Sequence, residues 1–193
     1  MIELEDFGSV FIRALEVVDS DQPQEKPQYS PGIGPHTEAA IIRLIIQHLA
    51  NNDERFHQAA PKRYPYRRTT CDLVIPGQWA MEFKLARPYG DNGKPAENWI
   101  ENLLYPYRGN ISLIGDCFKL IDSGFCERLA IGVIGFEHES PQLTLDTAVN
   151  AFEMIARELL HFHLSQRITC ISNQLIHKHH QRCRLFLWEL SRR

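Results

Sequence analysis

Residues 71–86, "CDLVIPGQWAMEFKLA", decide the fold because they read as two short strands joined by a turn. Successive side chains of a strand point to opposite faces of its sheet. A three-residue loop at residues 76–78 places all the large apolar side chains on one face, whereas a two-residue loop would mix the faces. These apolar residues are Leu73, Ile75, Trp79, Met81, Phe83 and Leu85. The pattern therefore predicts a β-hairpin with the three-residue loop.

The other face of the predicted hairpin carries three charged side chains, Asp72, Glu82 and Lys84. Asp72 lies opposite Glu82 in the predicted register, and like charges that face each other across two strands repel. A divalent cation compensates for such repulsion, and Mg²⁺ prefers carboxylate oxygens. Lys84 is placed within reach of a metal-bound water or a phosphate. The pattern indicates metal-assisted phosphodiester hydrolysis, and the alternative is a solvated polar face with a Glu–Lys pair.

The segments around the hairpin predict an α/β fold. Residues 35–50 have the periodicity of a helix, with Pro35 at the first helical position. The periodicity and the turn residues also predict helices at 4–18, 99–104, 110–124 and 144–164, and strands at 128–137 and within 170–190. The expected architecture is one domain over residues 1–193, with a central mixed β-sheet flanked by helices. An N-terminal helix and a polar loop, residues 1–34, precede its core.

The composition limits the function classes. The net charge of −3 over 193 residues gives no global basic signature, so a nucleic-acid contact must come from a local patch. No apolar run approaches the ~20 residues of a membrane helix, and the N-terminus lacks a signal-peptide pattern. The five cysteines form no CxxC pair. This pattern favours a reduced, cytoplasmic protein and argues against a zinc site.

A local basic patch stands just before the hairpin, in "KRYPYRR" at residues 62–68. We predict that its cations contact nucleic-acid phosphates, and a solvated basic loop is the alternative. These cations are Lys62, Arg63, Arg67 and Arg68. Lys119 lies one helical turn after Asp116, so we predict an ion pair between the two side chains. A contact of Lys119 with a phosphate is the alternative.

Two further groups of residues receive structural interpretations. In "HKHH", His177 and His179 are expected on one strand face, at the surface or near a phosphate, because a structural zinc site needs four ligands. The aromatic residues Trp99, Tyr105 and Tyr107 are expected to pack in the core and loops, with base stacking as the alternative.

Asp72, nine intervening residues and then Glu82-Phe83-Lys84 resemble the motif of the PD-(D/E)xK nuclease superfamily, which has the restriction-endonuclease-like fold. In that family a helix precedes the hairpin that carries the motif, and a helix and a strand follow it. The order here is similar from about residue 35 to residue 137. The residue before Asp72 is Cys71, where the family pattern has proline.

The resemblance implies roles for individual residues. Asp72 and Glu82 would hold Mg²⁺, which Mn²⁺ can replace, with the Phe83 carbonyl completing the metal shell. Lys84 would orient or activate the attacking water. The family often has a helical glutamate near the metal, and Glu38 matches it because it heads the apolar stripe of its helix. Stabilisation of Glu38 by the helix dipole is the alternative.

The resulting expectation is a metal-dependent nuclease acting on DNA, with RNA as the alternative nucleic acid and no membrane partner. The resemblance also motivates the hypothesis of a homodimer on duplex DNA, since one active site cuts one strand at a time. Two other hypotheses stay open. One is a catalytically inactive nuclease-fold protein that binds nucleic acid or a protein partner, and the other is a plain interaction domain.

Overall fold

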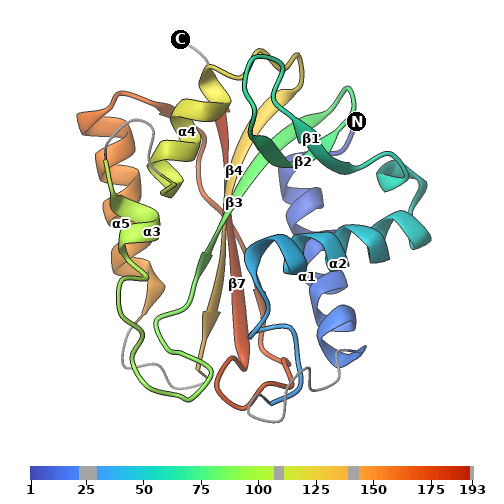
Figure 1. Ribbon diagram of the computed structural model, residues 1–193, viewed down its shortest axis with the longest axis vertical. Coiled ribbons are helices and arrows are strands. Elements are labelled where there is room, and N and C mark those ends of the chain that lie inside the picture. The colour runs from blue at the N-terminus through green and yellow to red at the C-terminus, as the bar shows by residue number, and fades with distance from the viewer. Residues whose placement is uncertain (22–29, 107–110, 139–143, 192–193) are drawn as a thin grey trace.

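The computed structural model describes residues 1–21, 30–106, 111–138 and 144–191. In this part of the chain a mixed sheet lies between two layers of helices (Figure 1). The helical segments are α1 (Leu4–Asp21), α2 (Glu38–Asn52), η1 (Glu54–Phe56), α3 (Glu101–Leu104), α4 (Leu113–Ile121), α5 (Leu145–Met154) and the π-helical turn η2 (Ile155–Leu159). The strands are β1 (Ala60–Arg63), β2 (Thr70–Ile75), β3 (Trp79–Ala86), β4 (Arg128–Glu137), β5 (His163–Leu164), β6 (Ile168–Ser172) and β7 (Arg182–Ser191). The predicted α/β class, a mixed sheet flanked by helices, is confirmed.

The strand order is β1-β2-β3-β4-β7-β5, and β6 also pairs with β7. Only β3 and β4 run parallel to each other among the described strands, and the other neighbours are antiparallel. A parallel pair needs a crossover connection, and α3 and α4 lie in this one. Strand β4 is buried on both faces, as its apolar sequence predicts.

The hairpin of β2 and β3 has the predicted register. Leu73 pairs with Met81 and Ile75 pairs with Trp79, which leaves a loop at residues 76–78. Gly77 adopts a φ of 69° in this loop, a conformation that favours glycine. The prediction of a three-residue loop is therefore confirmed.

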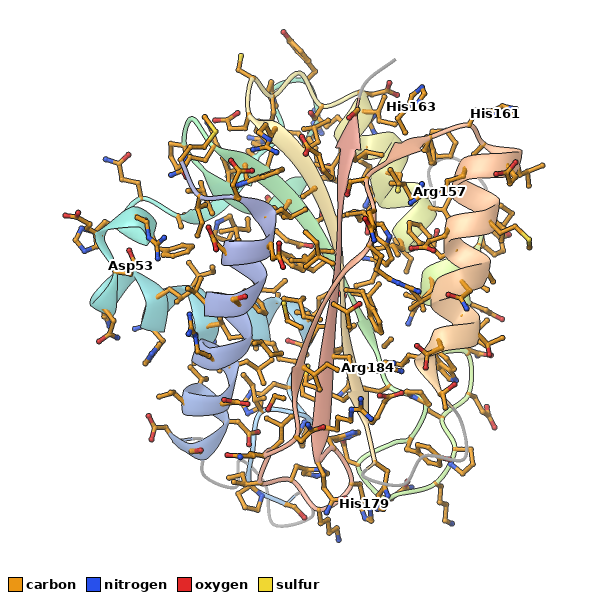
Figure 2. All side chains as sticks on the ribbon, turned by 180° about the vertical axis from the view of Figure 1, so that it is seen from behind. Asp53, Arg157, His161, His163, His179 and Arg184 are labelled. Carbon is orange, nitrogen blue, oxygen red and sulfur yellow. The ribbon has the colours of Figure 1, made fainter. Side chains whose placement is uncertain are left out.

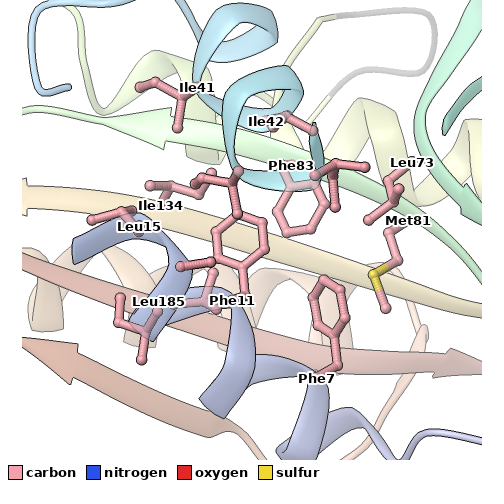
Figure 3. Close-up of a cluster of buried hydrophobic side chains, with 14 of the residues drawn as sticks. Phe7, Phe11, Leu15, Ile41, Ile42, Leu73, Met81, Phe83, Ile134 and Leu185 are labelled. Atoms are coloured by element: carbon pink, nitrogen blue, oxygen red, sulfur yellow. The ribbon is translucent and has the colours of Figure 1, made fainter. Parts of the chain in front are cut away.

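Each face of the sheet has its own apolar core. The core under α1 and α2 contains the large apolar side chains of the hairpin (Figure 3). The Phe11 and Phe83 rings stack there with centroids 5.6 Å apart. A Cβ atom on Gly132 would lie 2.6 Å from the Phe83 ring, so glycine lets this ring lie against β4. The second core joins α4 and α5 to the sheet, and its members include Phe152 and Trp188.

Several expected helix boundaries are wrong by a few residues or more, and two of them have a clear physical reason. Helix α2 begins at Glu38, and Thr37 is its N-cap, with the side-chain oxygen accepting from Ala40 N at 3.4 Å. The first N–H groups of a helix have no partner within the helix, and the Thr37 side chain accepts from one of them. A proline side chain has no oxygen and cannot do this. The helix expected to reach residue 164 leaves α-helical geometry after Met154, widens into a π turn that ends at Leu159, and is followed by His161 with a φ of 55°.

Strand β1 has no counterpart among the strands that the sequence predicts. All four of its residues are exposed, so no apolar alternation reveals it in the sequence. None of the described helices is long and apolar enough to cross a membrane. The five cysteines are free thiols.

Candidate active site

The pairing of β2 with β3 stops at Leu73 and Met81, and beyond it two carboxylates accept hydrogen bonds from the backbone of β3. Asp72 Oδ2 accepts a hydrogen bond from Phe83 N at 2.8 Å. Glu38 Oε2 accepts one from Leu85 N at 2.6 Å. Backbone N–H groups in a sheet need partners, and here side chains from β2 and α2 supply them. The two acids are therefore fixed beside the charged face of β3.

Glu82 is the most perturbed acid of this cluster. Its side chain is buried, with 4% of the residue exposed, and its Oε1 accepts a hydrogen bond from the Tyr64 hydroxyl. Burial, the charge of Asp72 and a hydrogen bond to Asp72 together raise the pKa of Glu82 to about 10. Burial and the neighbouring Asp72 therefore favour the protonated form of Glu82 in the metal-free protein.

Lys84 lies between two acids from different helices. Its Nζ atom is 2.8 Å from Asp116 Oδ2 and 3.5 Å from Glu38 Oε1. Burial alone would lower the pKa of Lys84, but the charges of Asp116 and Glu38 outweigh it and raise the pKa above its usual value. Asp116 and Glu38 therefore favour the ammonium form of Lys84.

Asp116 of α4 is completely buried. It forms ion pairs with Lys84 and with Lys119, and the contact between Lys84 and Asp116 Oδ2 lacks hydrogen-bond geometry. Burial raises the pKa of Asp116, and the two lysines oppose this shift. The sequence suggested only the local pair with Lys119. The structure adds the link to Lys84.

Tyr64 is the other site residue that the sequence did not reveal. It is 2% exposed, whereas Tyr66 in the same basic segment is 82% exposed. Nothing in the pattern of residues 61–70 distinguishes the two tyrosines. Burial of Asp116, in contrast, could have been inferred from its place among apolar residues on one face of α4.

The charges of this cluster suit a divalent cation. Four carboxyl groups and two lysines lie in it, so ionisation of all four acids gives an excess of two negative charges. The acids are Glu38, Asp72, Glu82 and Asp116. Mg²⁺ is commonly bound through one or two carboxylates and several waters, and the adjacent Asp72 and Glu82 fit this pattern.

Other predicted metal ligands are placed differently. In the described residues no three His, Cys, Asp or Glu side chains are arranged to hold a metal ion. Glu38 is directed to Leu85 N and Lys84, and the Phe83 carbonyl lies 3.4 Å from Lys84 Nζ. Metal ligation by Glu38 and Phe83 stays a prediction.

The basic segment is attached to the site through Tyr64. Its four predicted phosphate-binding cations, Lys62, Arg63, Arg67 and Arg68, are all exposed. Arg67 lies 3.5 Å from Asp122, with both side chains about 38% exposed, so this pair contributes little and leaves the arginine available. The segment thus presents positive charge next to the acidic cluster.

The histidine segment, residues 177–180, is more buried than the sequence predicts. Residues 177–180 lie in the connection between β6 and β7 (Figure 2), and His177 and His180 are buried with stacked rings 4.6 Å apart. Surface placement on one strand face is therefore wrong for His177. Its Nδ1 accepts from the backbone N–H groups of His179 and His180, and burial lowers the pKa of His177 to about 4. These contacts indicate a structural role.

Comparisons of the chain with protein-family models, with curated proteins and with solved structures find no match. The resemblance to the PD-(D/E)xK superfamily therefore stays a prediction based on the motif. What the structure contributes is the grouping of Asp72, Glu82 and Lys84 with Glu38, Asp116 and Tyr64 at one edge of β3.

Proposed function

We propose that the protein is a metal-dependent nuclease that hydrolyses phosphodiester bonds, with DNA as the substrate. One observation carries this proposal. Asp72 accepts a hydrogen bond from Phe83 N, between the buried Glu82 and the cation Lys84, so two acids and a lysine meet at one edge of β3. A divalent cation bound by Asp72 and Glu82 would neutralise both acids.

Asp72 and Glu82 would hold Mg²⁺ or Mn²⁺, which lowers the pKa of a bound water and neutralises charge on the scissile phosphate. Lys84 stabilises the negative charge that develops on the phosphate. Asp116 and Glu38 hold its ammonium group in place. Tyr64 orients Glu82, and the exposed cations of residues 62–68 attract the phosphate backbone.

The proposal is tested with a panel of single-stranded and duplex DNA and RNA, with and without Mg²⁺ or Mn²⁺. We expect cleavage only with metal. Asp72→Asn should abolish cleavage and the rise in melting temperature that Mg²⁺ causes, while Lys84→Ala should lose cleavage and keep the Mg²⁺ effect, because lysine is not a metal ligand. The control variants Asp6→Asn and Lys178→Ala change exposed residues away from the cluster.

Three outcomes contradict the proposal. Cleavage by Asp72→Asn at the wild-type rate would move the active site elsewhere. Nucleic-acid binding without cleavage under any metal condition would identify the inactive binding protein. The absence of both would favour the plain interaction domain.

A further inference from the structure

A cleft of about 670 Å³ opens beside Lys84. The start of α2, the end of β3 and the segment from residue 87 to residue 102 surround it. Its lining includes Glu38, Lys84, Arg87, Asp91, Trp99 and Asn102, and Tyr89 is a second aromatic residue there. Its volume lies within the range of small-molecule sites, about 300–1,000 Å³.

Trp99 gives this cleft an aromatic wall. The indole packs against the core formed by α4, α5 and the sheet, and it also lines the cleft. Trp79 and Trp188 are fully buried, whereas Trp99 is half-buried. Tyr105 does not line the cleft, and Tyr107 lies outside the described residues. Packing, the interpretation favoured for Trp99 from the sequence, thus accounts for only part of its surroundings.

The far wall of the cleft is held by polar contacts. Arg87 Nη1 donates to Gly34 O at 2.8 Å, and Asp91 Oδ1 lies 2.9 Å from Nε2 of the buried His180. The hydrogen bond with His180 lowers the pKa of Asp91, so this carboxylate is charged at neutral pH. These contacts fix the segment after β3 to two other parts of the chain.

Away from Lys84, which the proposed function assigns to the phosphate, the charges in the cleft favour an uncharged ligand. The cation in that part, Arg87, lies 3.9 Å from Asp91. Glu97 adds another acid to the lining. A nucleobase is uncharged and has an aromatic face, so it suits a cleft with a tryptophan wall and polar groups at its rim.

We infer that this cleft binds an unpaired base of the strand being cut, stacked on Trp99, with the neighbouring phosphate at Lys84. The inference rests on the proposed nuclease function, because the base that it places on Trp99 is the one next to the phosphate that is cut. Bases inside a duplex have no free face for a side chain. The protein should therefore prefer single strands or frayed ends over intact duplex.

The test uses the intrinsic fluorescence of Trp99, the tryptophan that a ligand can reach. A single-stranded oligothymidylate of about 10 nucleotides is titrated into the full chain, with Mg²⁺ and with EDTA, beside a duplex of the same length. We expect the single strand to quench the fluorescence and the duplex to quench it much less. Trp99→Ala should bind the single strand roughly tenfold to hundredfold more weakly, as measured by anisotropy of a labelled strand.

Two further variants complete this test. Trp99→Phe should keep most of the affinity because phenylalanine also stacks, and its melting temperature reports on the fold. Ile100→Ala changes an exposed neighbour that does not line the cleft, and it should bind like the wild type. Equal binding of the single strand by Trp99→Ala and the wild type, equal quenching by the duplex, or no binding of either nucleic acid overturns the inference.

Cleavage measured on the same samples separates this inference from the proposed function. Quenching by the single strand without cleavage in Mg²⁺ or Mn²⁺ leaves the base-binding cleft and removes the nuclease. Cleavage without any dependence on Trp99 leaves the nuclease and removes the base-binding cleft.

Discussion

At the scale of single residues, Glu82 makes the stability of the metal-free protein depend on pH. Its folded-state pKa of about 10 is far above the value of about 4.3 in an unfolded chain. The folded state therefore holds the proton more tightly, and its contribution to stability is complete below about pH 4.3. This contribution falls as pH rises and is lost as pH passes through about 10.

Glu82→Gln should remove this dependence while keeping an oxygen for the Tyr64 hydroxyl. In thermal melts without metal, we expect the variant to gain melting temperature relative to the wild type as pH rises from about 5 to about 9. Glu158→Gln, at an exposed position, is the matched control. A constant difference between Glu82→Gln and the wild type over this range would show that Glu82 is ionised in the folded protein.

The sequence predicts some site residues and misses others for a physical reason. Asp72, Glu82 and Lys84 share a strand face, and strand alternation is a local property that can be read directly. Tyr64 and Asp116 join the site through contacts between segments, and neither has a local pattern that points to Glu82 or Lys84. Packing of α4 on β3 brings Asp116 to the site, and pairing of β1 with β2 brings Tyr64 there.

At the scale of elements, the start of α2 is attached to the edge of β3 through Glu38. Glu38→Gln keeps an oxygen that can accept from Leu85 N, so the fold should persist. It removes a negative charge next to Lys84, so we expect slower cleavage, and weaker Mg²⁺ stabilisation if Glu38 also contacts the metal. Melting curves and cleavage rates over a metal titration measure both effects.

The control for this variant is Glu54→Gln in η1, an exposed residue for which no ion pair is described. Full activity of Glu38→Gln at every metal concentration would show that Glu38 has no part in catalysis. Its role would then be to accept from Leu85 N and to interact favourably with the dipole of α2.

The basic segment that begins in β1 should determine the salt dependence of nucleic-acid binding. Replacing each of its four cations, Lys62, Arg63, Arg67 and Arg68, with glutamine removes phosphate contacts and the counterion release that accompanies them. Each lost contact should reduce the slope of log affinity against log salt by roughly 0.7–0.9. Affinities measured at several salt concentrations give this slope.

Arg13→Gln and Arg43→Gln serve as controls because these exposed arginines lie on α1 and α2. An unchanged slope in the four variants of the basic segment would remove it from the interface.

Element predictions succeed where apolar periodicity is strong. The hairpin is predicted correctly because its large apolar residues alternate along the sequence, and β4 because its apolar run is continuous. Strand β1 and the end of α5 are missed, since the former is fully exposed and the latter depends on a π turn. Neither exposure on a sheet edge nor a change of helix type leaves a periodic signal.

At the scale of the whole molecule, Asp19 connects three distant parts of the chain. It is completely buried at the end of α1, and its two oxygens accept from Ile33 N and Ile176 N, each at 2.7 Å. Asp19→Asn offers one acceptor oxygen for two donors. We expect a loss of about 1–3 kcal/mol in the free energy of unfolding, the usual cost of one unsatisfied buried donor.

Urea unfolding of Asp19→Asn and of the exposed control Asp21→Asn measures this loss. Equal stability of the two variants would mean that the N–H groups of Ile33 and Ile176 find other partners. The sequence could not show this link, because Asp19 looks like the first residue of a polar loop.

The position of β7 has a consequence for how the chain folds. This last strand lies between β4 and the β5–β6 edge, and α1 packs over β6 and β7 (Figure 1). Pairs such as Leu129 with Leu190 close long loops, which slows folding. During synthesis α1 can pack against α2 and the hairpin, but its part that lies on β6 and β7 stays uncovered until β7 has left the ribosome. A chain interrupted before residue 182 would keep this part exposed and would be a substrate for chaperones and proteases.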